Sequence, residues 1–178
     1  MRKITVSTMT ALDGVMGDPQ GWGAMSYFDE TAALDGLRRL QISDGMLLGR
    51  VTYEALAKAW TGRRGPFADR LTAIPKTVFS STLLAAEWGN ATIARGDVVS
   101  TVRTLKEGGE GDLVIFGHGR LTKTLLHAGL VDEIRLLIMP VLAGRGELLR
   151  ADIPPRAMKL VQATTLPSGV IILVHSLA

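Results

Sequence analysis

Leu47-Leu48-Gly49-Arg50-Val51-Thr52-Tyr53-Glu54 is the stretch that decides the fold. Its apolar start predicts a buried strand, and residues 53–60 are predicted to form a helix, so Gly49 and Arg50 lie at a strand-to-helix junction. A helix N-terminus offers unpaired N–H groups and a partial positive charge. Glycine lets a ligand approach the backbone, and an arginine can bind a phosphate with two hydrogen bonds. The junction therefore predicts a site for a phosphorylated ligand, although strand–glycine–helix turns also occur without one.

A second candidate phosphate segment follows the strand predicted at residues 76–80. The strand opens with Lys76 and runs into three hydroxyls, Ser80, Ser81 and Thr82. Hydroxyls and backbone N–H groups at the carboxyl end of a strand can bind phosphate oxygens. The alternative is a polar turn that caps the next segment, and the segment by itself favours this simpler interpretation.

A third candidate is Phe116-Gly117-His118-Gly119-Arg120-Leu121, between a strand predicted at 113–116 and a helix predicted at 120–128. Two glycines one residue apart allow close approach to the backbone, and the helix that follows offers its N–H groups to a pyrophosphate. The complete glycine pattern of a Rossmann fold is missing, so a tight turn is the alternative. His118 is accordingly either a phosphate or ribose contact or a turn residue.

The fourth segment, Leu12-Asp13-Gly14, follows a strand predicted at residues 4–9. In the functional interpretation the carboxylate of Asp13 lies at the mouth of the site, where it can hold a hydroxyl or relay a proton. Asp-Gly is also a strong turn signal by itself, and both interpretations stay open.

The order of the predicted elements indicates the fold class. Strands and helices alternate up to residue 132, and the remainder is rich in strands, with a hairpin turn at 167–169. This pattern predicts one α/β domain over residues 1–178, with a largely parallel sheet between helices and antiparallel C-terminal strands. The predicted helices are 28–42, 53–60, 98–107 and 120–128; the predicted strands are 4–9, 46–48, 76–80, 91–94, 113–116, 133–141, 158–166 and 170–177; residues 61–66 and 144–146 are predicted loops.

Composition excludes several classes of protein. The net charge of +3 could serve an anionic ligand, but the basic residues are scattered rather than clustered, which argues against nucleic acid. No apolar run approaches the roughly 18 residues that cross a bilayer, and the N-terminus does not read as a signal peptide, so we expect a cytoplasmic protein. There are no cysteines and the three histidines lack metal-ligand spacing, so we predict no metal site.

Taken together, the four segments resemble the dihydrofolate reductase superfamily. The resemblance is strongest to the reductase domain of the bifunctional riboflavin-biosynthesis deaminase-reductase and to its stand-alone relatives. It covers nearly the whole chain, and residues 131–134 and 140–146 resemble the C-terminal strand and loop of the riboflavin branch. The resemblance implies a three-layer α/β/α fold, hydride transfer from NADPH, and a homodimer.

The resemblance also assigns residues to the expected site. Residues near the nicotinamide would be Met16 and Gly17, while Met9, Asp13 and Trp22 would form the substrate pocket with Asp13 as the catalytic residue, although packing is the simpler role for Met9. The cofactor's phosphates and ribose would be held by Gly49, Arg50, Val51, Thr52, Ser80, Ser81, Thr82, Phe116, Gly117, His118, Gly119, Arg120 and Leu121.

Two positions depart from the resemblance. Dihydrofolate reductases carry an acid on a helix that supports protonation of the substrate, and Ala33 occupies that place here; Asp29, Glu30 and Asp35 are nearby and are interpreted as surface acids. Where the riboflavin reductase has a lysine on its first strand, this chain has Ser7. Because no acid occupies the place of Ala33, we expect dihydrofolate turnover to be weak or absent.

The sequence favours an NADPH-dependent reductase of a small heterocyclic, carbonyl or imine substrate. The best candidate reaction is reduction of 5-amino-6-(5-phosphoribosylamino)uracil in riboflavin biosynthesis. Dihydrofolate reduction and a nucleotide-binding module without turnover are the alternatives, and a basic nucleic-acid binder is a distant third. The apolar strand at 134–141 and the C-terminal hairpin form an apolar edge, which predicts a homodimer through these strands.

Overall fold

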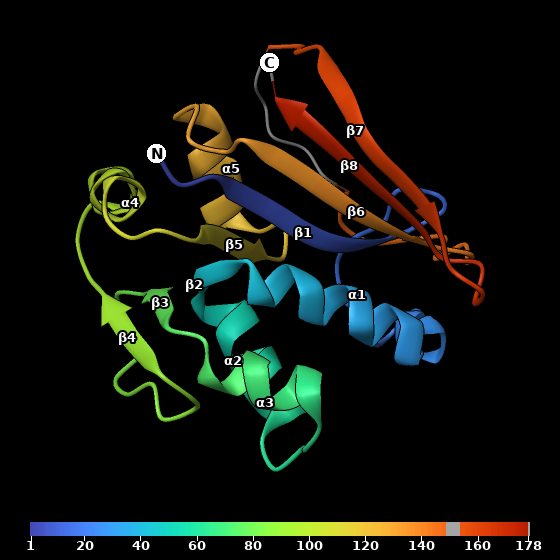
Figure 1. The fold of residues 1–178 in the computed structure, drawn as a ribbon, viewed down its shortest axis with the longest axis horizontal. Helices are drawn as coiled ribbons and strands as arrows, with labels where there is room; N and C mark the ends of the chain where they lie inside the picture. Colours follow the sequence, from blue (N-terminus) through green and yellow to red (C-terminus); the bar gives the residue numbers. More distant parts are fainter. Residues whose placement is uncertain (149–153, 178) are drawn as a thin grey trace.

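The computed structural model describes residues 1–148 and 154–177. Its strands are β1 (Ile4–Ala11), β2 (Ser43–Gly49), β3 (Lys76–Phe79), β4 (Ala91–Ala94), β5 (Asp112–Phe116), β6 (Glu133–Met139), β7 (Met158–Thr165) and β8 (Ile171–Leu177). They form an eight-stranded sheet in the order β4-β3-β2-β5-β1-β6-β8-β7 (Figure 1). All neighbouring pairs from β4 to β6 are parallel, whereas β8 is antiparallel to β6 and to β7. The predicted mixed sheet is confirmed.

Helices cover both faces of this sheet (Figure 1). They are α1 (Glu30–Gln41), α2 (Arg50–Trp60), α3 (Pro66–Ala73), α4 (Val98–Glu107) and α5 (Arg120–His127), with a short 3₁₀ helix η1 (Ala24–Tyr27) before α1. Leu40, Tyr53 and Leu71 pack α1, α2 and α3 on one face. Val102 and Leu125 pack α4 and α5 on the other. The predicted three-layer arrangement is confirmed, and no helix in the described ranges has the length and apolarity needed to cross a membrane.

Local signals explain several boundaries. Asp29 accepts a hydrogen bond from the N–H of Ala32 at 2.9 Å and so begins α1, and Asp97 begins α4 in the same way through Ser100 at 2.7 Å. Pro140, which has no N–H to donate, follows the last residue of β6. These side chains fix the ends of elements that the apolar pattern alone places only approximately.

The C-terminal hairpin is confirmed. The N–H of Leu166 donates to the carbonyl of Val170 at 2.8 Å, and the N–H of Gly169 donates to the carbonyl of Leu166 at 2.9 Å, which closes the turn between β7 and β8. β7 lies at the edge of the sheet and is exposed along most of its length. The C-terminal part of the sheet therefore ends in an open strand.

Several predicted elements have other bounds in the structure, and one helix was missed. The helix predicted at 53–60 begins three residues earlier, at Arg50, so the Gly-Arg junction is the first turn of α2 itself. Helix α3 was not predicted, and its first residue, Pro66, was assigned to a loop. It is stabilised by packing on α1, where Phe67 lies so close to Gly36 that an added Cβ would come within 2.8 Å of its ring.

Candidate functional site

The carboxyl ends of the parallel strands meet at one edge of the sheet. Gly49 ends β2 in register beside the last residue of β3, which Ser80 follows. Ser7 of β1 is in register with Phe116, the last residue of β5, and Gly117 follows it. The structure therefore brings these three predicted segments to one edge, which is where open α/β sheets bind ligands.

Two helices begin at this edge, each after a glycine. Gly49 precedes α2 and Gly119 precedes α5, and no side chain of the described residues caps either helix. The backbone is ordinary at both positions, with φ of −81° and −69°. No heavy atom of the described chain lies within 4 Å of where a Cβ would stand on either glycine. Folding therefore does not require glycine at either position, and the N–H groups of both first turns are open to a ligand.

Gly117 is different, because the fold does require it. Its φ is +94°, and a Cβ there would lie 3.0 Å from Oγ1 of Thr52 in α2. The N–H of Gly117 donates to the carbonyl of Ser7 at 3.3 Å, and Oγ1 of Thr122 donates to the carbonyl of Gly117 at 3.0 Å. The two strand-to-helix turns therefore touch and form one continuous surface.

Arg50 is the first residue of α2 and lies beside this surface. Its guanidinium pairs with Glu54 one turn later at 3.1 Å, and both side chains are 45% exposed. An exposed pair of this kind contributes at most about 1 kcal/mol, so an anionic ligand can compete for Arg50. Val51, the next residue of α2, is 70% exposed.

The hydroxyl segment forms a compact loop after β3. Oγ of Ser80 accepts hydrogen bonds from the N–H groups of Thr82 and Leu83, at 3.1 and 2.9 Å, so this hydroxyl shapes the turn as the simpler interpretation expected. Ser81 and Thr82 are exposed. Arg95, which the sequence analysis missed, comes just after β4 and donates to the carbonyls of Ser81 and Leu83 at 3.0 and 2.9 Å. Arg95 therefore places a cation beside this loop.

Some residues of the segment after Gly117 are exposed at the candidate site, and others pack in the core. Leu121 packs against the apolar cluster of α4 and α5, whereas Gly119 and Arg120 are exposed. Nε2 of His118 lies 3.6 Å from a carboxylate oxygen of Glu147. Burial lowers the pKa of His118, and the nearby Glu147 opposes that shift.

The loop after β1 is held by the loop after β6. A carboxylate oxygen of Asp13 accepts the N–H of Gly144 at 2.7 Å, and this hydrogen bond is the main reason why the pKa of Asp13 is lowered. The N–H of Met16 donates to the carbonyl of Glu147 at 2.8 Å, and a Cβ on Gly17 would lie 3.4 Å from the Cβ of Glu147. A carboxylate held in this way suits an orienting role better than donation of a proton.

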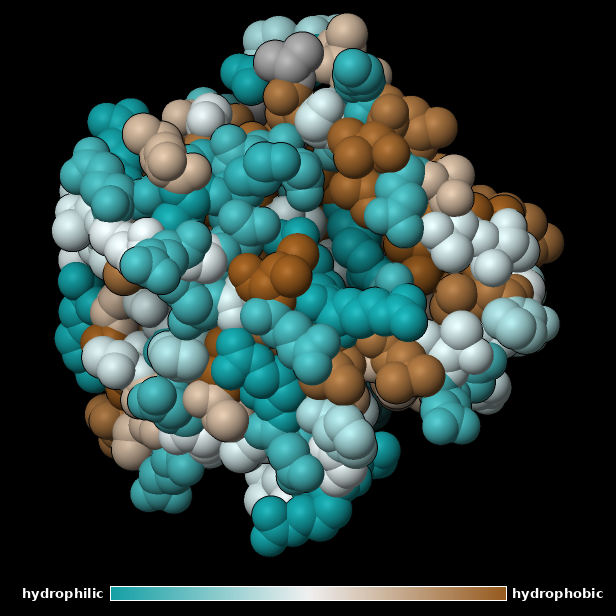
Figure 2. All heavy atoms as spheres, in the orientation of Figure 1, coloured by the Kyte–Doolittle hydropathy of each residue, from teal (hydrophilic) through white to brown (hydrophobic). Residues whose placement is uncertain are grey.

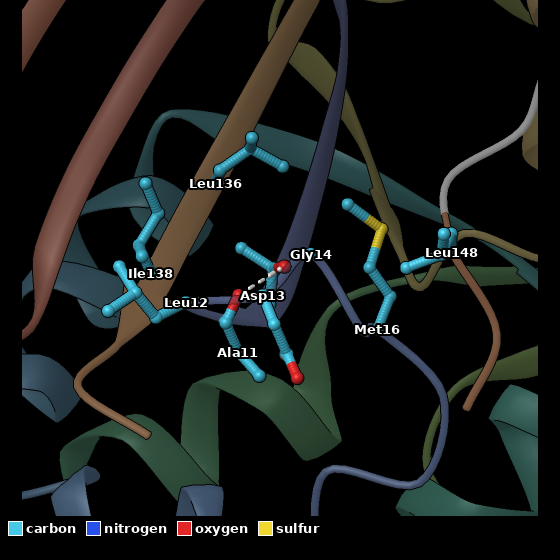
Figure 3. A pocket seen from close by; sticks show the side chains of 9 residues that line it. Ala11, Leu12, Asp13, Gly14, Met16, Leu136, Ile138 and Leu148 are labelled. Atoms are coloured by element: carbon cyan, nitrogen blue, oxygen red, sulfur yellow. Dashed lines mark hydrogen bonds between the residues drawn. The ribbon is translucent and has the colours of Figure 1, made fainter. Parts of the chain in front are cut away.

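Asp13 and Met16 line a pocket of about 420 Å³ (Figure 3). Its other walls include Thr10 of β1 and Leu136 and Ile138 of β6. Residues alternate between the two faces of a strand, and Ile134 of β6 belongs to the apolar cluster under α4 and α5. The Asp13 pocket therefore opens on the side of the sheet where α4 and α5 lie.

Met9 and Trp22 lie on the opposite face. They pack with Leu137 and Met139 of β6 and with Ala32 of α1. Nε1 of Trp22 also donates to the carbonyl of Gly17 at 2.7 Å, so the tryptophan is tied to the same loop as Met16. The structure thus does not bring Met9 and Trp22 to the pocket that Asp13 lines, although all three flank the carboxyl end of β1.

One group of charged residues was misinterpreted from the sequence. Asp35 of α1 is not a surface acid, because it forms an ion pair with Arg135 of β6, a residue that is itself buried. Asp29 remains exposed, as the N-cap of α1. No local signal reveals the pair, since its members are separated by 100 positions.

Comparison with known proteins identifies the family. The profile of the RibD C-terminal domain matches residues 2–172. The chain belongs to the RibD C-terminal domain family. Among curated proteins it is similar to the uncharacterized protein YyaP of Bacillus subtilis, with 27% identity over 181 residues that cover 98% of this chain and 94% of YyaP.

Two solved structures share this fold over nearly the whole length of both chains. A putative riboflavin biosynthesis protein from Shewanella sp. PV-4 is 18% identical, with a TM-score of 0.76 over 99% of both chains. A pyrimidine reductase-like protein from Corynebacterium diphtheriae is 13% identical, with a TM-score of 0.66 over 99% of this chain and 92% of that one. The deaminase/reductase of Thermotoga maritima is 15% identical, with a TM-score of 0.70, and this chain covers 57% of it. At these identities the likeness shows the shared fold.

Within residues 1–148 and 154–177, no group of three His, Asp or Glu side chains is arranged to hold a metal ion. The sheet edge instead offers open backbone N–H groups and exposed cations, which suit a phosphorylated organic ligand.

Proposed function

We propose that this protein is an NADPH-dependent reductase. The observation that carries the proposal is the pair of uncapped glycines, Gly49 and Gly119, which the fold itself does not need. Serine or aspartate is a better N-cap than glycine, so glycine at both helix starts is best explained by close approach of a ligand. Two uncapped helix N-termini, on turns that are in contact with each other, fit a ligand with several phosphates, such as a dinucleotide.

Particular side chains would then hold particular parts of the cofactor. The first turns of α2 and α5 would bind the pyrophosphate, and Arg50 with the loop at Ser80–Thr82 would bind the phosphate of the adenosine ribose. Met16 and Gly17, in the loop that the loop after β6 holds, would lie against the nicotinamide and exclude water. Bound NADPH supplies a hydride, while the protein positions it against the substrate.

Calorimetry with NADPH and NADH tests this proposal directly. Charge-assisted hydrogen bonds contribute about 1.5–3 kcal/mol each, so NADPH should bind at least tenfold more tightly than NADH. Equal affinity for the two cofactors would reject the assignment of Arg50 and the Ser80 loop. Absence of binding by either would reject the reductase.

For the substrate, we propose 5-amino-6-(5-phosphoribosylamino)uracil or a related heterocycle. Membership of the RibD C-terminal domain family supports a reductase of the riboflavin-pathway type. Oxidation of NADPH, followed with this compound and with dihydrofolate as parallel substrates, tests the choice. We expect turnover of the uracil and weak or no turnover of dihydrofolate.

We also propose a homodimer in the cytoplasm that does not bind nucleic acid. In register across the C-terminal strands, Leu136 lies beside Leu173, and Ile138 lies beside Ile171. Ile171 is 38% exposed, and Leu160 on the edge strand β7 is 53% exposed. An apolar face next to an open edge strand favours association with a second copy. A monomer mass by light scattering at micromolar concentration would contradict this.

A further inference from the structure

A charged cluster joins the loop after β6 to the start of α5. Nζ of Lys123 donates to Oε1 of Glu147 at 3.1 Å, and Oε2 of Glu147 lies 3.6 Å from Nε2 of His118. Lys123 is the fourth residue of α5, and His118 lies between the two glycines of the preceding turn. Both belong to the segment that would bind the cofactor's pyrophosphate. Glu147 therefore places a carboxylate beside a proposed anion site.

Backbone contacts join the loop of Glu147 to the loop after β1 as well. Val15 and Leu148 form an antiparallel bridge, and the N–H of Met16 donates to the carbonyl of Glu147 at 2.8 Å. The two loops pack tightly, because Gly146 has a φ of +142° and an added Cβ there would lie 2.5 Å from Cγ1 of Val15. The backbone of Glu147 thus holds the Met16 loop, while its side chain contacts α5.

Asp13 belongs to the same unit, since its carboxylate accepts the N–H of Gly144 at 2.7 Å. Asp13, Met16 and Leu148 line the Asp13 pocket, whereas the glutamate of this loop does not. The charged cluster lies on the α5 side of the sheet, opposite the hydrophilic recess between α1 and the C-terminal strands in Figure 2. Glu147 therefore affects the candidate site through its neighbours, without lining the pocket itself.

The stability of the fold does not account for this carboxylate. The side chains of Lys123 and Glu147 are 30% and 55% exposed, and exposed ion pairs contribute at most about 1 kcal/mol. The hydrogen bond from Lys123 lowers the pKa of Glu147, so the carboxylate is ionised at neutral pH. A negative charge near the uncapped start of α5 also disfavours a phosphate there. The two loops that Glu147 joins to α5 are the better explanation.

We infer that Glu147 is a positioning residue of the proposed reductase, which holds the loops of Asp13 and Met16 in place by pairing with Lys123 at the start of α5. The inference rests on the proposed function, because it takes the start of α5 as the pyrophosphate site. Two effects of opposite sign follow. Without the carboxylate the loops lose an anchor, and an anion binds at the start of α5 more tightly.

Amide hydrogen exchange of the ligand-free protein tests the anchor. Glu147→Gln removes the charge and keeps the size of the side chain. The N–H groups of Met16 and Gly144 should then exchange about twofold to fivefold faster, which corresponds to the loss of one exposed ion pair. The N–H of Leu166 closes the C-terminal hairpin and serves as an internal reference that should not change. Unchanged exchange at Met16 and Gly144 overturns the inference.

Calorimetry tests the effect on the anion site. The probe is 2′-phospho-ADP-ribose, which carries the pyrophosphate of NADPH but lacks the nicotinamide that the Met16 loop would contact. Glu147→Gln should bind this probe about twofold to fivefold more tightly than the wild type, because an opposing charge is removed from the start of α5. Equal or weaker binding overturns the inference, since loss of a residue that only supports the fold would not improve binding.

Lys123→Met separates the anchor from the charge. It breaks the same ion pair, so exchange at Met16 should rise as it does in Glu147→Gln. It also removes a cation, so the probe should bind more weakly. In the double variant exchange should be no faster than in the single variants, because either change already breaks the pair. Additive effects on exchange overturn the inference.

Turnover measures the consequence for the proposed reaction. With saturating NADPH and 5-amino-6-(5-phosphoribosylamino)uracil, Glu147→Gln should lower kcat about tenfold, because small misplacements of positioned groups are costly. An unchanged kcat overturns the inference.

Glu110→Gln is the matched control. Glu110 is an exposed glutamate that precedes β5, at the opposite end of this strand from the glycine turn. The variant should leave exchange, probe binding and kcat unchanged, and the inference fails if it reproduces the effects of Glu147→Gln. Failure of the wild type to bind both NADPH and the probe instead rejects the proposed reductase. Exchange in the ligand-free protein still decides whether Glu147 holds the loops.

Discussion

Replacing Gly119 with aspartate should strengthen the fold and weaken cofactor binding. The residue has the extended backbone of an N-cap, with φ of −69° and ψ of −158°, and free space around its missing Cβ. An aspartate there can accept an N–H of the first turn of α5, and its charge interacts favourably with the helix dipole. Together these effects predict a gain of about 0.5–1 kcal/mol in the free energy of unfolding, or roughly 1–4 °C in melting temperature.

Binding should change in the opposite direction. The new carboxylate occupies the N–H groups that a phosphate would use, so at least one charge-assisted hydrogen bond is lost. That loss is about 1.5–3 kcal/mol, which corresponds to roughly a tenfold to hundredfold weaker affinity for NADPH. Calorimetry and thermal unfolding of the same preparation give both quantities.

Two variants separate the causes. Gly119→Asn caps the helix without a charge, so it should weaken binding less than Gly119→Asp. Gly108→Ala changes a glycine at the far end of α4, where the nearest atom to a new Cβ is 3.8 Å away, and should leave NADPH binding unchanged. If Gly119→Asp binds NADPH within twofold of the wild type, the pyrophosphate does not lie on α5 and the reasoning is refuted.

Three further predictions follow from the site and the fold. Arg50→Ala should weaken NADPH about tenfold to a hundredfold and leave NADH nearly unchanged, as measured by calorimetry; an equal loss for both would show that Arg50 does not bind the ribose phosphate. Asp13→Asn should keep folding and NADPH binding but lower turnover if Asp13 orients the substrate, and on the order of a hundredfold if it also assists proton transfer; full activity of the variant would show that Asp13 only shapes the turn. Burial lowers the pKa of Lys76 to about 8, so the unfolded chain holds this proton more tightly and the free energy of unfolding should rise between about pH 8 and pH 10. Lys76→Met should flatten this rise in denaturant titrations, and an identical pH profile would contradict the burial of a charged amine.

Much of the fold could be predicted from the sequence, because its signals are local. Met46, Leu47 and Leu48 form an unbroken apolar run, which is typical of a strand buried on both faces, and all three are at most 1% exposed. Alternating strand and helix patterns then require parallel pairing, since a helix returns the chain to the same end of the sheet. For this reason the glycine junctions after β2 and β5 and the hydroxyl segment after β3 lie at the same edge of the sheet.

Other features depended on tertiary structure, because they join residues far apart in the chain. Helix α3 was not predicted from the sequence, and it packs on α1. The sequence could not show that Gly117 is required by its φ and by Thr52, while Gly119, two residues later, stands in open space. That distinction is what separates a structural glycine from a candidate ligand contact.

The sequence by itself thus determined the order of the strands and of the helices other than α3, the mixed sheet, and the edge at which we propose that a phosphorylated ligand binds. The tertiary structure determined on which face of the sheet each side chain lies. It placed Asp13 with Leu136 on one side of β1 and Met9 with Trp22 on the other. It also turned Asp35 from an apparent surface acid into the partner of a buried arginine. The physical reason is that periodicity reports whether a residue is buried, whereas only the packed chain determines which distant group it meets.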